Sequence, residues 1–262
     1  MLNGSTSATS PRRATSPPEP TLLRRVADSL VAILIAPSCA ACARPLEQPT
    51  LGPVCALCWR AVVFNRPPFC AQCGDPLATW RAREARSSLC PRCLRRPSSI
   101  IAARAVGPYD GSLRAILHAF KYGRRQSLAR PLGALMADAP GEIFDGIDMV
   151  VPVPLHWRRR RQRGFNQAEA LARALGLPWR NALRRTRRTP SQTDLPAAQR
   201  HANVRNAFAL RRRASVSGRS ILLTDDVATT GATLEACATV LRAAGAREVR
   251  ALTVARVASR VL

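Results

Sequence analysis

Lysine, acidic residues and aromatic residues are all scarce in this sequence. Of its 262 residues, 41 are lysine or arginine and 16 are aspartate or glutamate, and Lys121 is the only lysine. The preference for arginine, together with the high alanine content, is typical of a GC-rich coding sequence, but it leaves the formal net charge at +25. A positive surplus of this size indicates polyanionic partners, either nucleic acid or a phosphate-rich ligand.

The sequence also lacks an apolar run long enough to cross a membrane. The best candidate, residues 26–36, contains Asp28 and is shorter than the roughly 20 residues that a spanning helix needs. Basic residues precede it, so it loosely resembles a secretion signal, but cleavage there would disrupt the first cysteine motif at Cys39. We therefore expect residues 21–37 to form a helix that docks on the fold of a cytoplasmic protein without a membrane span.

Cysteine is nearly absent outside one short segment. Eight of the nine cysteines form four CxxC pairs between Cys39 and Cys93, and Cys237 lies on an apolar helix face as a predicted core residue. Disulfide frameworks are typical of short secreted chains, whereas CxxC pairs confined to one segment of a longer chain are typical of metal ligation in a reducing cytosol. Since each pair presents two thiolates and zinc takes four, the motifs predict two structural Zn²⁺ sites.

Adjacent pairing of the motifs gives two ligand sets. The sets are Cys39, Cys42, Cys55 and Cys58, and then Cys70, Cys73, Cys90 and Cys93. The motifs also permit an interleaved pairing. Because a closed four-thiolate site has no open position for a substrate, we assign it no catalysis. The segment is either a docking surface for nucleic acid or protein, or a structural element too small to fold without metal.

Four segments of different character follow one another along the chain. Residues 1–20 are rich in Ser, Thr and Pro and are expected to be a disordered tail. After the helix at 21–37, residues 38–97 hold the cysteine motifs, and residues 98–262 alternate between apolar strands and amphipathic helices. This alternation predicts one α/β domain with a parallel sheet covered on both faces.

The expected elements of that domain can be placed from their periodicity. Strands are expected at 101–109, 148–154, 220–224 and 248–255, and helices at 111–121 and 230–244. A further helix opens at Asn166, with Glu169 placed to cap it.

The segment after the strand at 220–224 carries the most specific motif. Two carboxylates, Asp225 and Asp226, lead into a loop and a helix start with the sequence Thr229-Thr230-Gly231-Ala232-Thr233. Backbone amides at a helix N-terminus and threonine hydroxyls bind phosphate, and glycine permits close approach. We expect the carboxylates to accept hydrogen bonds from ribose hydroxyls and to be dispensable for folding. The motif therefore predicts a 5-phosphoribosyl ligand; the alternative is a solvated acidic turn before an ordinary helix.

This stretch resembles the phosphoribosyl-diphosphate (PRPP) signature of type I phosphoribosyltransferases. Together with the CxxC pairs, other motifs resemble the ComF competence-protein family, from about Leu22 onward. These motifs are His118-Ala-Phe-Lys121-Tyr122-Gly123, Val151-Pro-Val-Pro154-Leu-His156, Arg163-Gly-Phe-Asn-Gln167, Gln192, Arg200, Asn203 and Phe208. The resemblance implies an α/β protein with a parallel-sheet type I phosphoribosyltransferase fold at 98–262 and an N-terminal cysteine-rich double zinc ribbon at 38–97.

A second anion site is expected after the strand at 148–154. The arginines at 158–161, then Arg163 and Gly164, precede the new helix at Asn166. Arginines and loop amides at the carboxyl end of a strand suit an anion in an open α/β sheet. The resemblance implies that Arg163 and Gly164 bind the pyrophosphate of PRPP, with Mg²⁺. The alternatives are a solvated basic loop and a contact with nucleic acid.

Three hypotheses of function follow from these sites. The chain is a phosphoribosyltransferase, or it binds PRPP or a nucleotide-like ligand without turnover, or it handles single-stranded DNA through its basic surface and zinc ribbons. The third hypothesis, with its partners in the competence machinery and DNA uptake, is what the family resemblance implies. It is compatible with either of the others, and the sequence identifies no acceptor and no catalytic residue.

Overall fold

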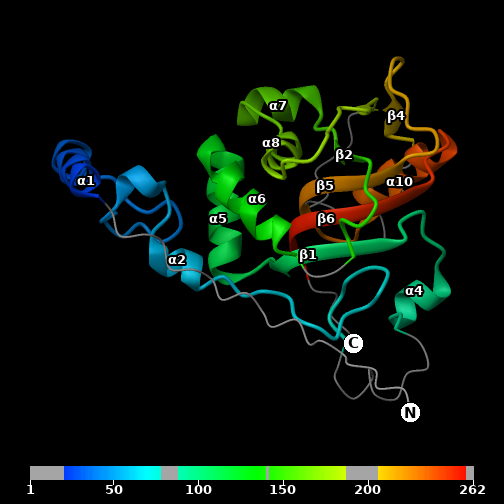
Figure 1. The fold of residues 1–262 in the computed structure, drawn as a ribbon, viewed down its shortest axis with the longest axis horizontal. Helices are drawn as coiled ribbons and strands as arrows, with labels where there is room; N and C mark the ends of the chain where they lie inside the picture. Colours follow the sequence, from blue (N-terminus) through cyan, green and yellow to red (C-terminus); the bar gives the residue numbers. More distant parts are fainter. Residues whose placement is uncertain (1–20, 78–87, 140–141, 187–205, 258–262) are drawn as a thin grey trace, which may run out of the picture.

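The computed structural model describes residues 21–77, 88–139, 142–186 and 206–257, so the predicted tail at 1–20 lies outside it. Its centre is a four-stranded sheet with the order β1-β6-β5-β2, shown in Figure 1. The strands are β1 (Ala102–Pro108), β2 (Met149–Pro152), β5 (Ser220–Ala228) and β6 (Glu248–Arg256). Every neighbouring pair is parallel, which confirms the predicted parallel sheet.

The two central strands are apolar because both of their faces are covered. In β5, Ile221, Leu222 and Leu223 are all fully buried, as the continuous apolar run requires. The strand is longer than predicted, since its pairing with β6 continues as far as Ala228. Asp225 and Asp226 therefore lie within the strand and not after it.

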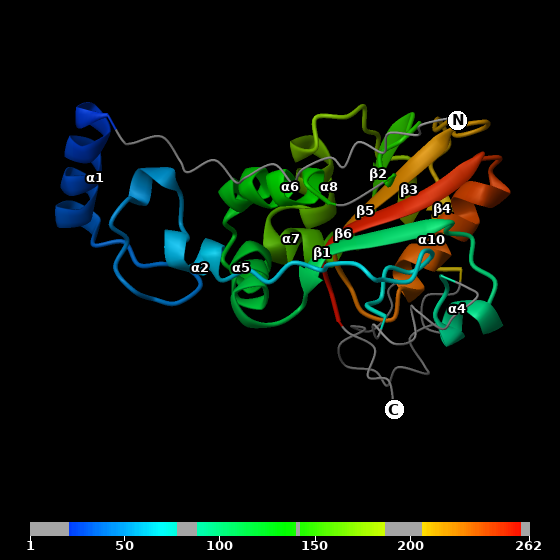
Figure 2. The ribbon, with the colours of Figure 1, turned by 60° about the horizontal axis from the view of Figure 1, so that its bottom comes forward.

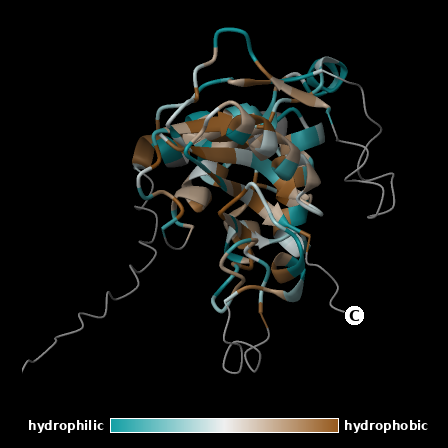
Figure 3. Ribbon diagram, turned by 90° about the vertical axis from the view of Figure 1, so that its right-hand side faces the viewer, coloured by the Kyte–Doolittle hydropathy of each residue, from teal (hydrophilic) through white to brown (hydrophobic). Residues whose placement is uncertain are grey.

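Helices cover the two faces of the sheet unequally. One face carries α5 (Gly111–Tyr122), α6 (Ala129–Ala137) and α8 (Gln167–Ala174), which share a core with the sheet. The other face carries α10 (Ala232–Ala243) and the antiparallel pair of β3 (Leu183–Arg185) and β4 (Phe208–Leu210). In Figure 3 the hydrophobic residues gather along the sheet and the helices that flank it.

Side-chain caps fix where two of these helices begin. Asp110 accepts a hydrogen bond from the Gly111 amide at the start of α5, and Asn166 accepts one from the Ala168 amide at the start of α8. The prediction that Glu169 caps α8 is wrong, because its carboxylate lies 2.6 Å from the Arg173 guanidinium, one turn further along the helix.

The two cysteine segments lie at opposite ends of the sheet domain (Figures 1 and 2). The first contains η1 (Pro49–Leu51) and α2 (Ala56–Arg60) and packs against α5. The second contains α4 (Pro91–Arg95) and lies beside β1 and α10. We call them the first ribbon (residues 38–60) and the second ribbon (residues 69–95).

The N-terminal helix α1 (Leu22–Ile35) contacts the first ribbon at η1. The Asp28 carboxylate accepts a hydrogen bond from the Thr50 amide at 2.9 Å. The helix docks only in part, because it contacts the first ribbon at η1 while Leu22 and Leu23 are 79% and 85% exposed. Within the described ranges, no helix has the length and apolar character needed to cross a membrane.

Candidate functional site

All four strands of the sheet end at one edge, and the predicted anion-binding residues follow two neighbouring strands there. β5 leads through residues 229–231 into α10, and β2 leads to α7 (Trp157–Arg163). Open α/β sheets bind their ligands in the crevice at the carboxyl ends of the strands. Because β2 pairs with β5, the structure brings the two predicted anion sites to adjacent strand ends.

The loop before α10 leaves backbone amides available. Gly231 is the N-cap of α10 with a left-handed φ of +79°, and the Thr230 hydroxyl accepts a hydrogen bond from the Ala232 amide at 3.4 Å. Within the described residues, the Thr230 and Gly231 amides donate to no acceptor. A Cβ on Gly231 would meet no atom within 4 Å, so glycine is required here by φ and not by a close approach. Thr229 and Thr233 flank this loop, and the whole arrangement suits a phosphate.

Asp226 forms a buried ion pair with Lys121 from the last turn of α5. The ammonium lies 3.0 Å from the carboxylate, and the two side chains are only 13% and 10% exposed. Burial disfavours the Lys121 ammonium, but the Asp226 carboxylate outweighs this effect and raises the pKa of Lys121. Asp226 thus contributes to the packing of α5 on the sheet, contrary to the expectation that both carboxylates are dispensable for folding.

Asp225 is in a different environment from its neighbour. Successive side chains of a strand point to opposite faces, so Asp225 faces the α10 side of the sheet, where it acts on the Cys237 thiol. It accepts a hydrogen bond from the Asp226 amide at 2.9 Å and has no ion pair among the described residues. Burial and then the Asp226 charge raise the pKa of Asp225 to about 7, against the opposing charges of Lys121 and Arg163. Of the two carboxylates, Asp225 is therefore the one without an ion pair in the described part of the chain.

Arg163 and Gly164 end a helix that the sequence did not predict. The arginines at 158–161 lie in α7 and not in a loop, and Gly164 closes α7 with a left-handed φ of 82°. The Arg163 guanidinium lies 5.3 Å from the Tyr122 ring and donates to the side-chain oxygen Oε1 of Gln167 at 3.1 Å. The side-chain nitrogen Nε2 of Gln167 is buried and has no hydrogen-bond partner in the described part of the chain. Arg163 and Gln167 together therefore offer N–H donors at this edge.

Lys121 and Gln167 are the site residues that the sequence analysis did not single out. Both lie inside the motifs of the family resemblance, and Lys121 is the only lysine in an arginine-rich chain. A single lysine among so many arginines could have indicated a buried ion pair, since an ammonium is a compact point charge that suits pairing with one carboxylate. The family positions Gln192, Arg200 and Asn203 lie outside the described residues.

The cysteines gather into two sets of four. In each set the sulfur atoms all lie within 4.8 Å of one another, and the sets are Cys39, Cys42, Cys55 and Cys58, then Cys70, Cys73, Cys90 and Cys93. Adjacent motifs therefore pair, and the interleaved arrangement is excluded. Sulfur–sulfur distances of 3.7 to 3.9 Å are too long for disulfides. Thiolates bound at about 2.3 Å to a tetrahedral zinc ion lie about 3.8 Å apart, so both clusters fit a structural zinc ion.

Local hydrogen bonds support the thiolate form of one ligand in each cluster. The side chain of Cys73 and several backbone amides, including that of Cys90, donate to the Cys70 sulfur and lower its pKa to about 4, although burial opposes the shift. In the first ribbon, the amides of Ala41 and Cys55 donate to the Cys39 sulfur at 3.4 and 3.3 Å. Zinc binds thiolates, so these donors favour metal binding.

The second ribbon is attached directly to the strand edge that carries residues 229–233, the predicted phosphate loop. Asp75 forms a buried ion pair with Arg256, the last residue of β6, and lies 3.5 Å from Arg92 of α4. Gly74 packs against the β1 backbone so closely that a Cβ would lie 2.4 Å from the Ala103 carbonyl oxygen. In the register of the sheet, Arg256 is opposite Ala228, so the ribbon is anchored one strand away from the phosphate loop.

Comparisons with known proteins agree with this architecture. A family model of the phosphoribosyl transferase domain matches residues 126–262, and a model of the double zinc ribbon domain matches residues 30–94. The DNA utilization protein YhgH of Salmonella typhimurium is 35% identical over 81% of this chain and 93% of its own length. Competence protein F of Haemophilus influenzae is 31% identical over 72% of this chain and 85% of its own length. Competence protein ComFC of Bacillus subtilis is 29% identical over 78% of this chain and 77% of its own length.

Among solved structures, a likeness is found to glutamine PRPP amidotransferase from B. subtilis complexed with ADP and GMP. It has 28% sequence identity and a TM-score of 0.33, and it covers 49% of this chain but only 26% of that enzyme. The conclusion about family rests instead on the two domain models and the curated relatives. The chain belongs to the family of the ComF competence proteins and YhgH, in which a double zinc ribbon precedes a phosphoribosyltransferase domain.

Proposed function

We propose that the chain binds PRPP with Mg²⁺ at the carboxyl edge of its sheet and transfers the 5-phosphoribosyl group to an acceptor. The observation that carries the proposal is that free amides at Thr230 and Gly231 follow β5, the strand that holds the Asp225 carboxylate in its C-terminal half. Amides at a helix N-terminus suit the 5-phosphate. A carboxylate without an ion pair suits the ribose hydroxyls.

The roles of the surrounding residues follow from their contacts. Residues 229–233 hold the 5-phosphate, and Asp226 is held in place by Lys121. Arg163 and Gly164, with Gln167, bind the pyrophosphate. The buried amide nitrogen of Gln167, which lacks an acceptor among the described residues, supports this role, because a buried unpaired donor is costly unless a ligand accepts from it. Mg²⁺ prefers phosphate and carboxylate oxygens and would neutralise the pyrophosphate charge.

The transfer itself needs mainly positioning and charge stabilisation. A nucleophilic atom of the acceptor forms a bond to C1 of the ribose, while the bond from C1 to the pyrophosphate oxygen breaks. The electron pair leaves with pyrophosphate, and the proton of the nucleophile passes to solvent. The guanidinium of Arg163 and the amides at the strand ends stabilise the departing charge.

Calorimetry with PRPP and Mg²⁺ tests the binding step. Thr230→Val removes a hydroxyl of the phosphate loop and should weaken PRPP binding by more than about tenfold. Thr239→Val is the matched control, since Thr239 is exposed on α10 away from the loop. It should change the PRPP affinity less than twofold. Equal effects of the two substitutions would contradict the site. Release of pyrophosphate in a screen of bases, amines and DNA then distinguishes transfer from binding without turnover.

A second function, the handling of single-stranded DNA, is favoured by the surface of α7. Trp157 is 56% exposed, and its ring lies 5.1 Å from the Arg158 guanidinium and 5.7 Å from that of Arg161. Exposed aromatic rings among arginines stack with unpaired bases. The names of the relatives, which refer to competence and DNA utilization, support the same function.

Titration with an oligothymidylate tests this function. Trp157→Ala should weaken binding by about tenfold, because one base–aromatic stack contributes roughly 1–3 kcal/mol. The affinity for PRPP serves as the control and should not change, since Trp157 is outside the proposed PRPP site. An oligothymidylate affinity unaffected by the substitution would remove α7 from the DNA surface.

The setting of these functions is proposed from the same observations. Thiolate clusters suited to zinc and a basic surface suited to DNA fit a cytoplasmic protein that works with the competence machinery. We further propose that residues 98–262 form the phosphoribosyltransferase-like domain and that residues 38–97 form the double zinc ribbon, whose two ribbons lie apart on that domain and are each stabilised by metal.

A further inference from the structure

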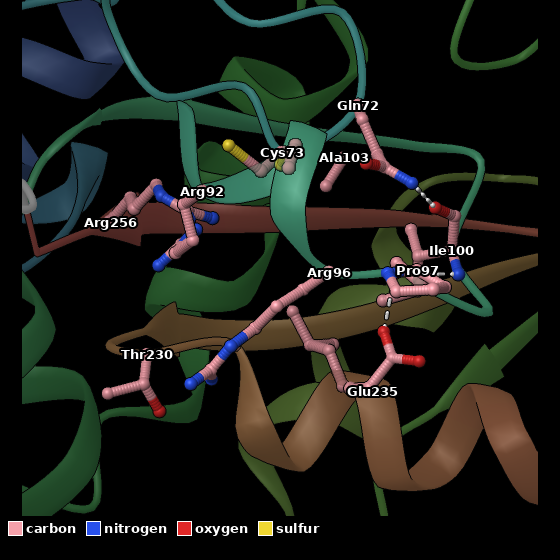
Figure 4. Close-up of a pocket in the computed structure, with 14 residues that line it drawn as sticks. Gln72, Cys73, Arg92, Arg96, Pro97, Ile100, Ala103, Thr230, Glu235 and Arg256 are labelled. Atoms are coloured by element: carbon pink, nitrogen blue, oxygen red, sulfur yellow. Dashed lines mark hydrogen bonds between the residues drawn. The ribbon is translucent and has the colours of Figure 1, made fainter. Parts of the chain in front are cut away.

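The second ribbon and the phosphate loop enclose a cavity of about 210 Å³ (Figure 4). One wall comes from the ribbon and the segment that follows it, with Gln72, Arg92 and Arg96 among its residues. The other wall comes from Thr230, Gly231 and the first turns of α10. The cavity thus lies beside the place proposed for the 5-phosphate, on the side away from β2.

Three arginines and one carboxylate line the cavity, beside two cysteines of the second metal cluster. Arg92, Arg96 and Arg256 all line it, and Asp75 pairs with the first and the last of these. The carboxylate of Glu235, which also lines the cavity, accepts hydrogen bonds from the Ser98 hydroxyl and the Ser99 amide and is therefore already engaged.

Arg96 is the cation without a counter-charge. It forms no ion pair within the described residues, and in Figure 4 its side chain runs from the end of α4 toward Thr230. An arginine held at the wall of a cavity presents a planar fork of donors that matches a carboxylate or a phosphate. Arg96 is exposed at this wall, so its guanidinium is available to an anion.

The rest of the cavity determines what kind of anion fits. Pro97, Ile100 and Leu234 give it apolar walls, which an inorganic ion would not use. Its volume of about 210 Å³ is smaller than the roughly 300–1,000 Å³ of sites that take drug-sized ligands. A nucleotide or a stretch of DNA is too large for this space, whereas a single ring with one acidic group is not.

We propose that this cavity binds a small organic acid, with its carboxylate at Arg96 and its apolar body against Pro97, Ile100 and Leu234. The identification of that acid as the acceptor of the phosphoribosyl group rests on the proposed function. The second ribbon then contributes directly to substrate recognition, because Cys73 and Cys93 of its metal cluster also line the cavity.

Titration of the intact, zinc-loaded protein with benzoate, benzamide and inorganic phosphate tests the acid site. Benzoate should bind at least about tenfold more tightly than benzamide, its neutral counterpart of the same shape, since charge-assisted hydrogen bonds to arginine are the stronger ones. Arg96→Gln should remove this preference. Arg95→Gln is the matched control, because Arg95 is the adjacent arginine, is exposed and does not line the cavity, and it should preserve the preference.

Three results would overturn the proposal. These are equal affinities for benzoate and benzamide, equal effects of the two arginine substitutions, and displacement of benzoate by a tenfold lower concentration of phosphate. PRPP is titrated separately into the same samples, so the two proposals fail independently. Benzoate binding without PRPP binding refutes the phosphoribosyl site and leaves the acid site intact, whereas PRPP binding without benzoate binding refutes the acid site alone.

Discussion

Replacing Lys121 with methionine should destabilise the protein by about 3–4 kcal/mol at pH 7. The substitution keeps the length and apolar stem of the side chain but removes the ammonium that lies 3.0 Å from the Asp226 carboxylate. At this distance and an effective dielectric constant of about 20, two unit charges attract by about 5 kcal/mol. Removing one partner of a buried pair typically costs about 3–5 kcal/mol, because the other charge stays buried and unpaired.

In the Lys121→Met variant, Asp226 can take up a proton, and the free energy of that protonation is an upper limit on the loss of stability. An aspartate carboxyl group in an unfolded chain has a pKa near 3.9, and protonating it costs about 1.4 kcal/mol for each pH unit above that value, or about 4 kcal/mol at pH 7. The loss should therefore shrink as the pH is lowered toward 5. Asp226→Asn should cost a similar amount, because it leaves the Lys121 ammonium buried without a partner.

Chemical denaturation of the single and double variants measures this coupling. The double variant, with both substitutions, should be at least about 2 kcal/mol more stable than the sum of the single losses predicts. Asp225→Asn is the matched control. The pKa of Asp225 is raised to about 7, above its unfolded value near 3.9, so at pH 8 its ionised form opposes folding and the amide should leave stability unchanged or higher. Additive losses, or a loss below about 1 kcal/mol for Lys121→Met, would refute the buried pair.

Metal analysis of protein purified without chelator should return close to two zinc ions per chain. Cys55→Ser should release one ion and leave benzoate binding intact, whereas Cys90→Ser should release the other and abolish it; the reverse pattern would contradict the separate placement of the clusters. PRPP affinity should rise between pH 6 and 8 as Asp225 ionises, since its pKa is about 7, and Asp225→Asn should flatten that part of the rise, the remainder being the titration of PRPP itself. Affinity for single-stranded DNA should fall with salt more steeply than affinity for PRPP. Replacing the exposed Arg212 and Arg213 with serine should weaken DNA binding and leave PRPP binding unchanged. Full competition between PRPP and DNA at moderate salt would contradict separate binding surfaces for the two ligands.

The parts of the molecule that follow local rules were predictable from sequence. The four CxxC motifs identify all eight cluster ligands, since ligand spacing is a property of a short turn. The buried strand before Asp225 and the Thr-Thr-Gly loop after it lie close to the expected positions, because continuous apolar runs and helix starts have local signatures. The predicted end of that strand was too early, since the carboxylates interrupt the apolar run while the backbone pairing continues.

The parts that depend on contacts between distant segments were not predictable. Lys121 and Asp226 are separated by more than a hundred positions, and no local pattern reports that α5 brings them together. The helix at 157–163 was interpreted as a basic loop, because a run of arginines carries no apolar face to reveal a helical period. The cavity was equally hidden, since it exists only where Arg96 of one segment meets Thr230 of another.

The order of the strands bears on how the protein is made. β6 is the last strand in chain order among the described residues, yet it lies between β1 and β5. Chains emerge from the ribosome N-terminal end first, so both ribbons are exposed, and free to take up metal, while the sheet still lacks its central strand. The buried ion pair between Asp75 of the second ribbon and Arg256, at the end of β6, cannot form until β6 has been made. A chain interrupted before β6 would therefore carry all eight metal-cluster cysteines but lack the strand that joins β1 to β5.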